Sequence, residues 1–422
     1  MASDRADIAI IGGGAAGLTA AIYAAQAAGS AGSPLRIVVL DGAATLGAKI
    51  LVAGGGRCNV THDLVTPADF NGSRNIVRNI LAAFDADATV RWFAEMGVQL
   101  KREDTGKLFP VTDSARTVLN ALLDRCKRLD VALQSSSKVT AIEPPGSGGA
   151  DFTITYATNA QLHAKRIVLC TGGKSLPRSG SDGSGWTLAA SLGHTVTPTY
   201  MALVPLVLGP GSFHADLSGI SLDVELTTLV GNKPIDRRTG SLLWTHFGLS
   251  GPVVMDASRH WIIARDTGQA PEMRVSFLPG ESLESAEKWL LAQFANRPKA
   301  AVGNVLSARF PERVALALLQ HAKVDANTLA GQVSRDARKA LLNTLIALPL
   351  PIAHGRGWNY AEVTAGGVPL SEIDFRTMQS RKTPGLYLAG EILDCDGRIG
   401  GYNFQWAWAT GYLAGNAAAK DR

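Results

Sequence analysis

The hydrophobic pattern at the start of the chain predicts a βαβ unit. An apolar run predicts a buried strand over residues 7–11, followed by a glycine turn. Alanine-rich sequence predicts a helix that ends near Ala28, and a second apolar run predicts a strand over residues 36–40. Two buried strands joined by a helix are the building block of a parallel sheet. We therefore expect an α/β fold with a Rossmann-type domain.

The period of the hydrophobic pattern changes further along the chain. Before about Gly193 it still alternates between helix and strand, with a helix capped by Asp113 or Ser114 and apolar strands that end at Cys170. Every second residue is then apolar over residues 222–226 and 273–277, as in an antiparallel sheet. Helical spacing follows over residues 285–347, and a strand-loop-helix pattern returns over residues 385–419. A mixed segment is thus inserted between two parts of the α/β pattern.

A glycine-rich turn follows the first strand. Residues 12–17 read G-x-G-x-x-G and open a helix, and Asp41 follows at the end of the next strand. In this motif Gly12 permits the tight turn, Gly14 lets the backbone approach a pyrophosphate, and Gly17 lets helix and strand pack closely. The helix N-terminus offers free N–H groups to phosphates, and Asp41 can accept hydrogen bonds from ribose hydroxyls. The unit predicts dinucleotide binding.

The position of the other glycine turns favours FAD over NAD. A second glycine-rich stretch, residues 180–185, does not have the fingerprint spacing, so a separate NAD(P) domain is not expected. Residues 385–391 form a strand that ends in Gly-Glu, where Glu391 can bind the ribityl chain. Residues 400–403 then open a helix whose N-terminus can face the flavin pyrimidine. We expect FAD as the cofactor and NAD(P)H as a transient electron donor; an ordinary crossover is the alternative for the C-terminal unit.

Composition narrows the remaining classes. The 422 residues suggest two or three domains, and a net charge of +5 with no long basic run makes nucleic acid an unlikely partner. The uncharged stretch of residues 8–29 contains three consecutive glycines, so we expect neither a signal peptide nor a membrane span. Scattered cysteines without a C-x-x-C pair or zinc-ligand spacing suggest reduced thiols, no metal site and a cytoplasmic protein. These cysteines are Cys58, Cys126, Cys170 and Cys395.

Four ordered motifs together resemble a known family. They are G-G-G-R-C-N at 54–59, T-H-F-G-L-S-G-P at 245–252, E-V-T-A-G-G at 362–367, and G-E-I-L-D at 390–394 with G-G-Y-N-F-Q-W-A-W at 400–408. These motifs are similar to those of the BaiN-like bacterial flavoproteins, NAD(P)/FAD-dependent oxidoreductases, from residue 7 to about 419. The chain departs from the family at Asp41, where glutamate is frequent, but the shorter acid still reaches a ribose.

The resemblance implies a discontinuous FAD-binding domain (1–193 and 357–422), an inserted antiparallel β-barrel-like domain (194–283) and a helical subdomain (284–356). It also implies that the 54–59 loop contacts FAD and that Val139 presents its backbone to the adenine. Together, the motifs and the resemblance nominate the following cofactor-binding residues: Gly12, Gly14, Ala15, Ala16, Gly17, Asp41, Lys49, Gly55, Gly56, Arg57, Cys58, Asn59, Val139, Thr171, Gly172, Gly173, Gly390, Glu391, Gly400, Gly401, Tyr402, Asn403 and Phe404.

Two residues are candidates for catalysis. His246 can transfer a proton alongside a hydride, or it can simply hold a loop by hydrogen bonds. Arg57 can stabilise negative charge on reduced flavin or hold a carboxylate substrate, or it can brace its loop. We interpret Cys58 as a packing residue, because no partner cysteine is near it in the sequence.

The sequence thus predicts an FAD-dependent oxidoreductase that transfers a hydride between a small organic substrate or NAD(P)H and FAD. Three alternatives remain open: an amine or amino-acid oxidase that uses dioxygen, an RNA-modifying or RNA-binding flavoprotein, and a protein with purely structural FAD. The substrate and the oligomeric state do not follow from the sequence. Hydrolytic functions are not supported, because no P-loop, Ser-His-Asp pattern or glycosidase carboxylate pair is present.

Overall fold

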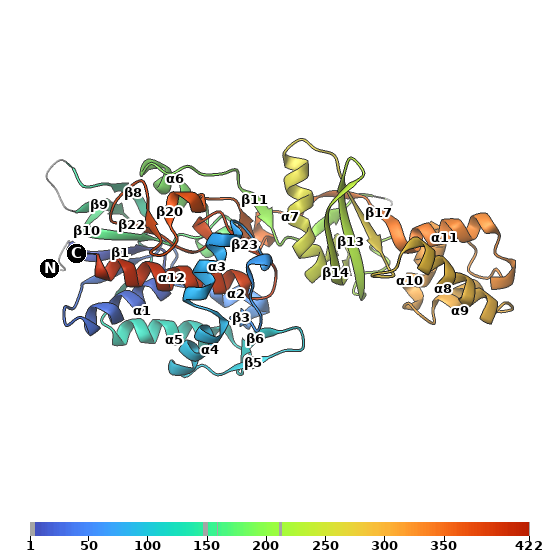
Figure 1. The fold of residues 1–422 in the computed structure, drawn as a ribbon, viewed down its shortest axis with the longest axis horizontal. Coiled ribbons are helices and arrows are strands. Elements are labelled where there is room, and N and C mark those ends of the chain that lie inside the picture. The colour runs from blue at the N-terminus through green and yellow to red at the C-terminus, as the bar shows by residue number, and fades with distance from the viewer. Residues whose placement is uncertain (1–4, 147–150, 158, 211–212, 422) are drawn as a thin grey trace. The chain divides into compact units, whose positions relative to one another are not determined.

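The computed structural model describes residues 5–146, 151–157, 159–210 and 213–421. The chain forms two compact units, one of Met1–Met201 with Trp358–Arg422 and one of Ala202–Gly357 (Figure 1). This division is coarser than the three expected domains, and the boundary between a barrel-like domain and a helical subdomain stays a prediction.

The first unit is built on a mainly parallel sheet. Its strand order is β20-β21-β22-β10-β1-β2-β7, and neighbours from β22 to β7 are parallel. The strands are β1 (Arg5–Ile11), β2 (Ile37–Leu40), β7 (Ala132–Gln134), β10 (Ala160–Leu169), β20 (Ile373–Asp374), β21 (Gln379–Ser380) and β22 (Leu386–Leu388). In addition, β9 (Phe152–Tyr156) pairs antiparallel with β10, and β8 (Val139–Glu143) pairs antiparallel with β9. The central strands read as continuous apolar runs because helices cover both faces of such a sheet. This confirms the Rossmann-type α/β domain.

Helices and three small sheets complete this unit. The helices are α1 (Ala15–Ser30), α2 (Ala48–Gly56), α3 (Arg74–Ala83), α4 (Ala86–Glu95), α5 (Ala115–Arg128), α6 (Ser184–Ser191) and α12 (Tyr402–Lys420). The small sheets pair β3 (Thr61–His62) and β5 (Leu100–Arg102) with β6 (Lys107–Pro110), β4 (Phe70–Asn71) with β23 (Asp396–Gly397), and β11 (Tyr200–Ala202) with β19 (Val363–Ala365).

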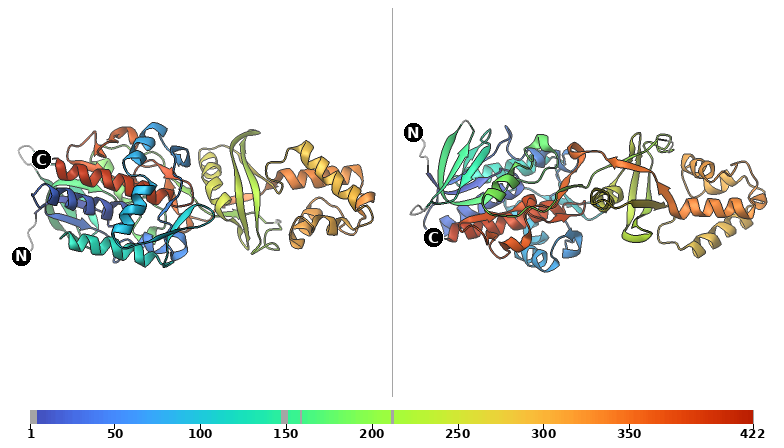
Figure 2. Two further views of the ribbon diagram at one scale, coloured as in Figure 1. Left: turned by 60° about the horizontal axis from the view of Figure 1, so that its bottom comes forward. Right: turned by 90° about the horizontal axis from the view of Figure 1, so that it is seen from above.

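Helices α1 and α12 lie side by side and run in the same direction (Figures 1 and 2). Their contact depends on glycine: a Cβ on Gly411 would lie 2.5 Å from the carbonyl oxygen of Ala16, and one on Gly415 would lie 2.3 Å from that of Ala20. Both pairs have the same offset, so α12 begins about 12 Å beyond the start of α1 along their shared direction, at 1.5 Å per residue. Two helix N-termini are therefore held at a fixed stagger at one end of the sheet.

The second unit combines a curved antiparallel sheet with helices. The sheet has the order β17-β16-β13-β14-β15-β12-β18. Its strands are β12 (Leu206–Leu208), β13 (Ser221–Val230), β14 (Lys233–Thr245), β15 (Gly248–Ser250), β16 (Pro271–Ser276), β17 (Leu348–Leu350) and β18 (Ile352–Gly355). The two edge strands, β17 and β18, are separated in the chain by Pro351 alone. The sheet therefore curves so strongly that one extended segment provides the strands at both of its edges.

Helix α7 (Pro252–Asp266) packs on this sheet, and a helical segment leads from β16 to β17. The helical pattern expected over residues 285–347 is resolved into four helices: α8 (Leu283–Asn296), α9 (Val302–Leu306), α10 (Glu312–His321) and α11 (Arg335–Ala347).

Candidate dinucleotide site

The three fingerprint glycines have different surroundings. A Cβ on Gly12, whose φ is +104°, would lie 2.4 Å from the carbonyl oxygen of Cys170, and a Cβ on Gly17 would lie 1.8 Å from that of Gly12. A Cβ on Gly14 would meet nothing within 4 Å. Gly12 and Gly17 are thus required by close backbone packing, whereas Gly14 borders open space.

That open space lies at the start of α1. The N-cap residue Gly14 provides no side-chain cap, and the first turn contains no acidic residue. The first N–H groups of a helix have no partner inside the helix, and the helix dipole adds positive potential there. The first turn, with Ala15 and Ala16, therefore provides a cradle of backbone donors that suits a pyrophosphate.

Asp41 is fixed next to this cradle. Its carboxylate accepts hydrogen bonds from the backbone N–H groups of Gly13 at 2.6 Å and Ala43 at 2.7 Å. A Cβ on Gly180 would lie 3.9 Å from the Asp41 Oδ1. The 180–185 stretch therefore borders the predicted ribose-binding acid, although the sequence assigned it no role. Within this stretch, Asp182 forms an ion pair with Lys138 at 2.5 Å. Val139, expected at the adenine, is a buried residue of β8.

Glu391 and Lys49 form the centre of a polar cluster. The Lys49 ammonium donates to the Glu391 carboxylate at 2.5 Å and to the Ser175 hydroxyl at 2.6 Å. The same carboxylate accepts from the Ser175 hydroxyl and from the Thr364 N–H, each at 2.9 Å. A Cβ on Gly173 would lie 2.7 Å from the Glu391 Oε1, so the glycine leaves room for the carboxylate. Lys49, Gly173 and Glu391 were predicted and are brought together; Ser175 and Thr364 were not.

The 54–59 loop has a strained backbone and a buried end. Glycines 54, 55 and 56 all have positive φ, and so does Cys58 at +60°. Cys58 is fully buried, and burial raises the pKa of its thiol to about 12, which excludes a reactive thiolate near neutral pH. It is a packing residue in the structure.

Two buried oxygens of the predicted site have no hydrogen-bond partner within the described part of the chain. They are the Asn59 Oδ1 in this loop and the Thr171 Oγ1 at the end of β10. Buried polar atoms in native proteins are nearly always satisfied, so unpaired atoms point to a missing group. Together with the open cradle at Gly14, they show that the residues present fit a polar cofactor.

Arg57 is held by its neighbours. Its guanidinium donates to the Glu103 carboxylate at 2.6 Å, lies 3.6 Å from Asp113, and stacks 4.0 Å from the ring centre of Phe109. These contacts agree with the bracing alternative rather than with a guanidinium that is free to meet a substrate.

The start of α12 is closely packed. Gly401 has a φ of +92°, and a Cβ there would lie 2.7 Å from the backbone of Thr61. The Asn403 side chain accepts from the Gly397 N–H at 2.8 Å and donates to its carbonyl at 2.9 Å. Three predicted residues therefore use their side chains internally, because Tyr402 stacks on His62 and Phe404 stacks on Trp408. The backbone N–H groups at the start of α12 can still serve a ligand.

His246 belongs to the other unit. It occupies the turn between β14 and β15, which is closed by hydrogen bonds between Thr245 and Gly248. The imidazole is exposed and contacts the ring of Phe247 edge-on at 5.2 Å.

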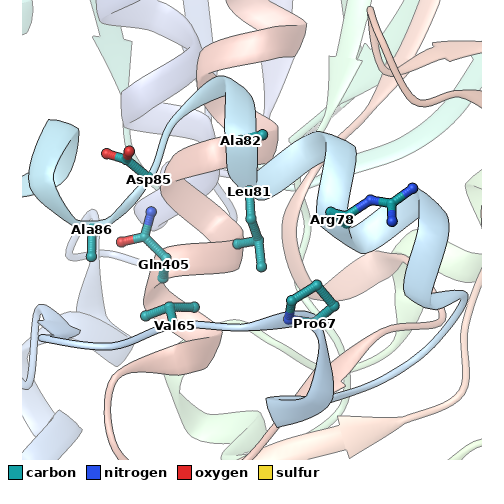
Figure 3. Close-up of a pocket in the computed structure, with 8 residues that line it drawn as sticks. All are labelled: Val65, Pro67, Arg78, Leu81, Ala82, Asp85, Ala86 and Gln405. Carbon is teal, nitrogen blue, oxygen red and sulfur yellow. The ribbon is translucent and has the colours of Figure 1, made fainter.

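A cavity of about 200 Å³ lies elsewhere in the first unit (Figure 3). Mostly apolar side chains line it, the fully buried Gln405 contributes its amide, and the Arg78 guanidinium points away from the rest. None of the predicted site residues borders it; the lining residues are Val65, Pro67, Arg78, Leu81, Ala82, Asp85, Ala86 and Gln405.

The described residues offer neither a metal site nor a membrane-spanning helix. No group of three or more His, Cys, Asp and Glu side chains among them is arranged to hold a metal ion. None of the helices they form has the length and apolar character needed to cross a membrane.

The fold and the cradle define a Rossmann-type dinucleotide-binding protein. Residues 6–417 match the model of the HI0933-like protein Rossmann domain, and the chain belongs to this family. The chain is 36% identical over 414 residues to a 3-dehydro-bile acid delta(4,6)-reductase of Clostridium scindens, covering 98% of this chain and 99% of the relative. It is 32% identical over 421 residues to a ribosomal RNA dihydrouridine synthase of Escherichia coli, covering 99% and 98%. The resemblance stated from the motifs is confirmed.

Solved structures agree with this fold. A 3-ketosteroid delta1-dehydrogenase from Sterolibacterium denitrificans matches with a TM-score of 0.53 at 12% identity, and each chain is covered completely. At this identity the match concerns the fold alone.

Proposed function

We propose that the chain is an FAD-dependent oxidoreductase that reduces a carbon–carbon double bond conjugated to a carbonyl group. The observation that supports FAD as the cofactor is the open cradle of backbone donors at Gly14, together with the fixed Asp41 carboxylate and two unpaired buried oxygens. The names of both full-length relatives describe the addition of hydrogen to an unsaturated ring, one a bile acid and the other a uracil base.

Each part of the site has a role in holding FAD. The first turn of α1 would bind the pyrophosphate, and Asp41 would accept hydrogen bonds from the adenosine ribose. Glu391, held in place by Lys49 and Ser175, would bind ribityl hydroxyls. The N-terminus of α12, staggered beyond that of α1, would place positive potential at the flavin pyrimidine. When bound, FAD supplies the hydride.

The chain must also supply a proton, because the reduction adds a hydride to one carbon and a proton to the carbon beside the carbonyl. His246 is our candidate, since its imidazole is exposed on a short, hydrogen-bonded turn. We assign Arg57 to loop bracing. We also propose that the curved sheet of the second unit is a barrel-like domain, and that NAD(P)H docks transiently to reduce the flavin.

The test is an anaerobic titration of the purified protein, followed by its visible spectrum. We expect flavin bands that bleach with NADH or NADPH and return when an α,β-unsaturated ketone is added. Bleaching only by amines or amino acids, with reoxidation by dioxygen, would instead identify an oxidase. Protein that cannot be loaded with FAD would overturn the proposal.

A variant separates the two half-reactions. His246→Gln should leave flavin reduction by NAD(P)H unchanged and slow reoxidation by the unsaturated ketone by about 10²–10⁴-fold, the usual contribution of a general acid. Equal rates in the variant and the wild type would remove His246 from the mechanism.

A ribosomal RNA uridine is the second candidate substrate. Relatives named ribosomal RNA dihydrouridine synthase cover almost the whole chain, at 32% and 30% identity, and the net charge is +5. Incubating the protein with NADPH and unmodified ribosomal RNA, then measuring dihydrouridine by nucleoside mass spectrometry, tests this directly. RNA retention that weakens steeply with salt would support it, because phosphate contacts release counterions.

A further inference from the structure

A continuous row of redox-active rings crosses the helical layer of the first unit. The Trp408 and Trp92 ring centres are 6.0 Å apart, Trp92 stacks on Tyr23 at 5.5 Å, and Tyr23 meets Tyr412 edge-on at 4.7 Å. Trp92 comes from α4, Tyr23 from α1, and the other two rings from α12. We call these four residues the aromatic row.

The row has an inner and an outer end. Trp408 is fully buried, and its indole N–H donates at 2.9 Å to the carbonyl of Val60, the residue that follows Asn59 in the loop expected to contact FAD. Tyr23 and Tyr412, at the other end, are partly exposed. The row therefore leads from the edge of the candidate flavin site to the protein surface.

The surroundings of the Trp92 and Trp408 indoles favour onward electron transfer over trapping of the radical on an indole. Tryptophan and tyrosine are easily oxidised side chains, and rings in contact exchange electrons rapidly because electronic coupling falls steeply with distance. An oxidised indole that loses its proton becomes a weaker oxidant. The Trp92 N–H is buried without a partner within the described residues, and the Trp408 N–H faces only a carbonyl oxygen, which is a poor base. Both oxidised indoles would thus keep their protons.

The tyrosines can end the row. An oxidised tyrosine gives up its phenolic proton and becomes a stable neutral radical. Burial, together with Tyr412 and Glu95, raises the pKa of Tyr23 above its ordinary value, so its phenol is protonated in the resting protein. The proton released on oxidation can leave to water at the partly exposed outer end.

We propose that Trp408, Trp92, Tyr23 and Tyr412 carry a single oxidising equivalent from the flavin site to the surface. A one-electron oxidant formed at that site, such as photoexcited FAD or a partly reduced oxygen species, takes one electron from Trp408. Trp92 returns an electron to Trp408, Tyr23 to Trp92, and Tyr412 to Tyr23, with one proton lost to water. A thiol or ascorbate in solution then supplies a hydrogen atom to Tyr412. The inference rests on the proposed function, because it needs FAD.

The test is laser flash photolysis of the FAD-loaded full chain, with its visible spectrum recorded first. In the wild type we expect a long-lived tyrosyl radical, detected by transient absorption and electron paramagnetic resonance, whose decay ascorbate accelerates. Trp92→Phe should lower its yield by at least an order of magnitude. Trp244→Phe is the matched control, since it removes another buried tryptophan whose N–H has no partner within the described residues, but in the other unit, and it should change nothing.

A second variant protects the test against a folding defect. Tyr23→Phe with Tyr412→Phe keeps both rings and removes only their hydroxyl groups, so the tyrosyl signal should vanish while the protein stays folded. FAD-loaded Trp92→Phe with the same radical yield as the wild type would overturn the aromatic row alone. Protein without bound FAD would overturn the proposed function and the row with it.

Discussion

Helices α1 and α12 begin in a similar way but use glycine differently. Both have a glycine N-cap without a side-chain hydrogen bond and no acid in the first turn. At Gly14 the missing side chain leaves open space, whereas at Gly401 it allows contact with the backbone of Thr61. One helix start thus leaves room beside its backbone, and the other is held in a fixed position by packing.

This difference separates two meanings of a glycine in a binding motif. A glycine required by packing affects stability and binding together when it is replaced, because the fold itself must shift. A glycine required by a ligand affects binding alone. Substitutions along α1 can test this distinction, since the helix contains both kinds.

Gly17→Ala should have the largest effect. Its Cβ would lie 1.8 Å from the Gly12 carbonyl oxygen, so strand and helix must separate. We expect unfolding to become easier by about 3 kcal/mol or more, at the upper end for overpacking, with loss of FAD binding. Thermal unfolding measures this. Gly29→Ala in the same helix is the control, because its Cβ meets nothing within 4 Å and it should be neutral or slightly stabilising.

Gly14→Ala should affect binding far more than stability. Its Cβ meets no atom of the protein and its φ of −85° suits any residue, so the stability of the FAD-free protein should fall by no more than about 1 kcal/mol, because alanine is a weaker N-cap than glycine. The methyl group would stand in the cradle, and FAD affinity measured by fluorescence titration should fall clearly. Unchanged FAD affinity would show that the pyrophosphate does not approach Gly14.

Glu391→Gln tests the polar cluster around Lys49 and Glu391. It leaves the Lys49 ammonium, whose side chain is 25% exposed, without its carboxylate partner. We expect a loss of about 2 kcal/mol in stability, less than for a fully buried pair, and weaker FAD binding. Lys49→Met combined with Glu391→Gln should recover part of the stability in a double-mutant cycle. Strict additivity of the two changes would mean that the pair contributes no coupling.

The sequence pattern predicted those parts of the site whose residues lie close together in the chain. The strand, the glycine turn, the helix and Asp41 lie within one βαβ unit, so their spacing reveals them. Ser175 could not be found in this way, because it meets Glu391 across 216 residues and only the folded sheet brings them together. The loop at Gly180 was excluded by its spacing, yet the parallel pairing of β10 and β1 carries it to Asp41. Strand β10 runs through the charged pair Lys165 and Arg166 as one strand, although these two residues interrupt its apolar pattern.

The smallest expected effect on stability concerns the hydrogen-bonded cluster of Glu372, His194 and Thr195. Glu372 accepts hydrogen bonds from buried His194 at 2.8 Å and from the Thr195 hydroxyl at 2.7 Å. Burial opposes its charge, but these hydrogen bonds outweigh burial and hold the pKa of Glu372 below its ordinary value. A lowered folded-state pKa stabilises the protein above the unfolded-state pKa of about 4.3, and this contribution is lost as the pH falls through the folded-state value.

Glu372→Gln should therefore cost about 1 kcal/mol between pH 6 and 8, and the difference from the wild type should shrink below about pH 4. Once the pH falls below the lowered folded-state pKa, the wild-type carboxyl is protonated and resembles the amide. Denaturant unfolding at a series of pH values measures the difference. Glu284→Gln, at a side chain that is 79% exposed, is the matched control and should leave the profile unchanged. A difference that stays constant down to pH 3 would mean that Glu372 acts through shape and not through charge.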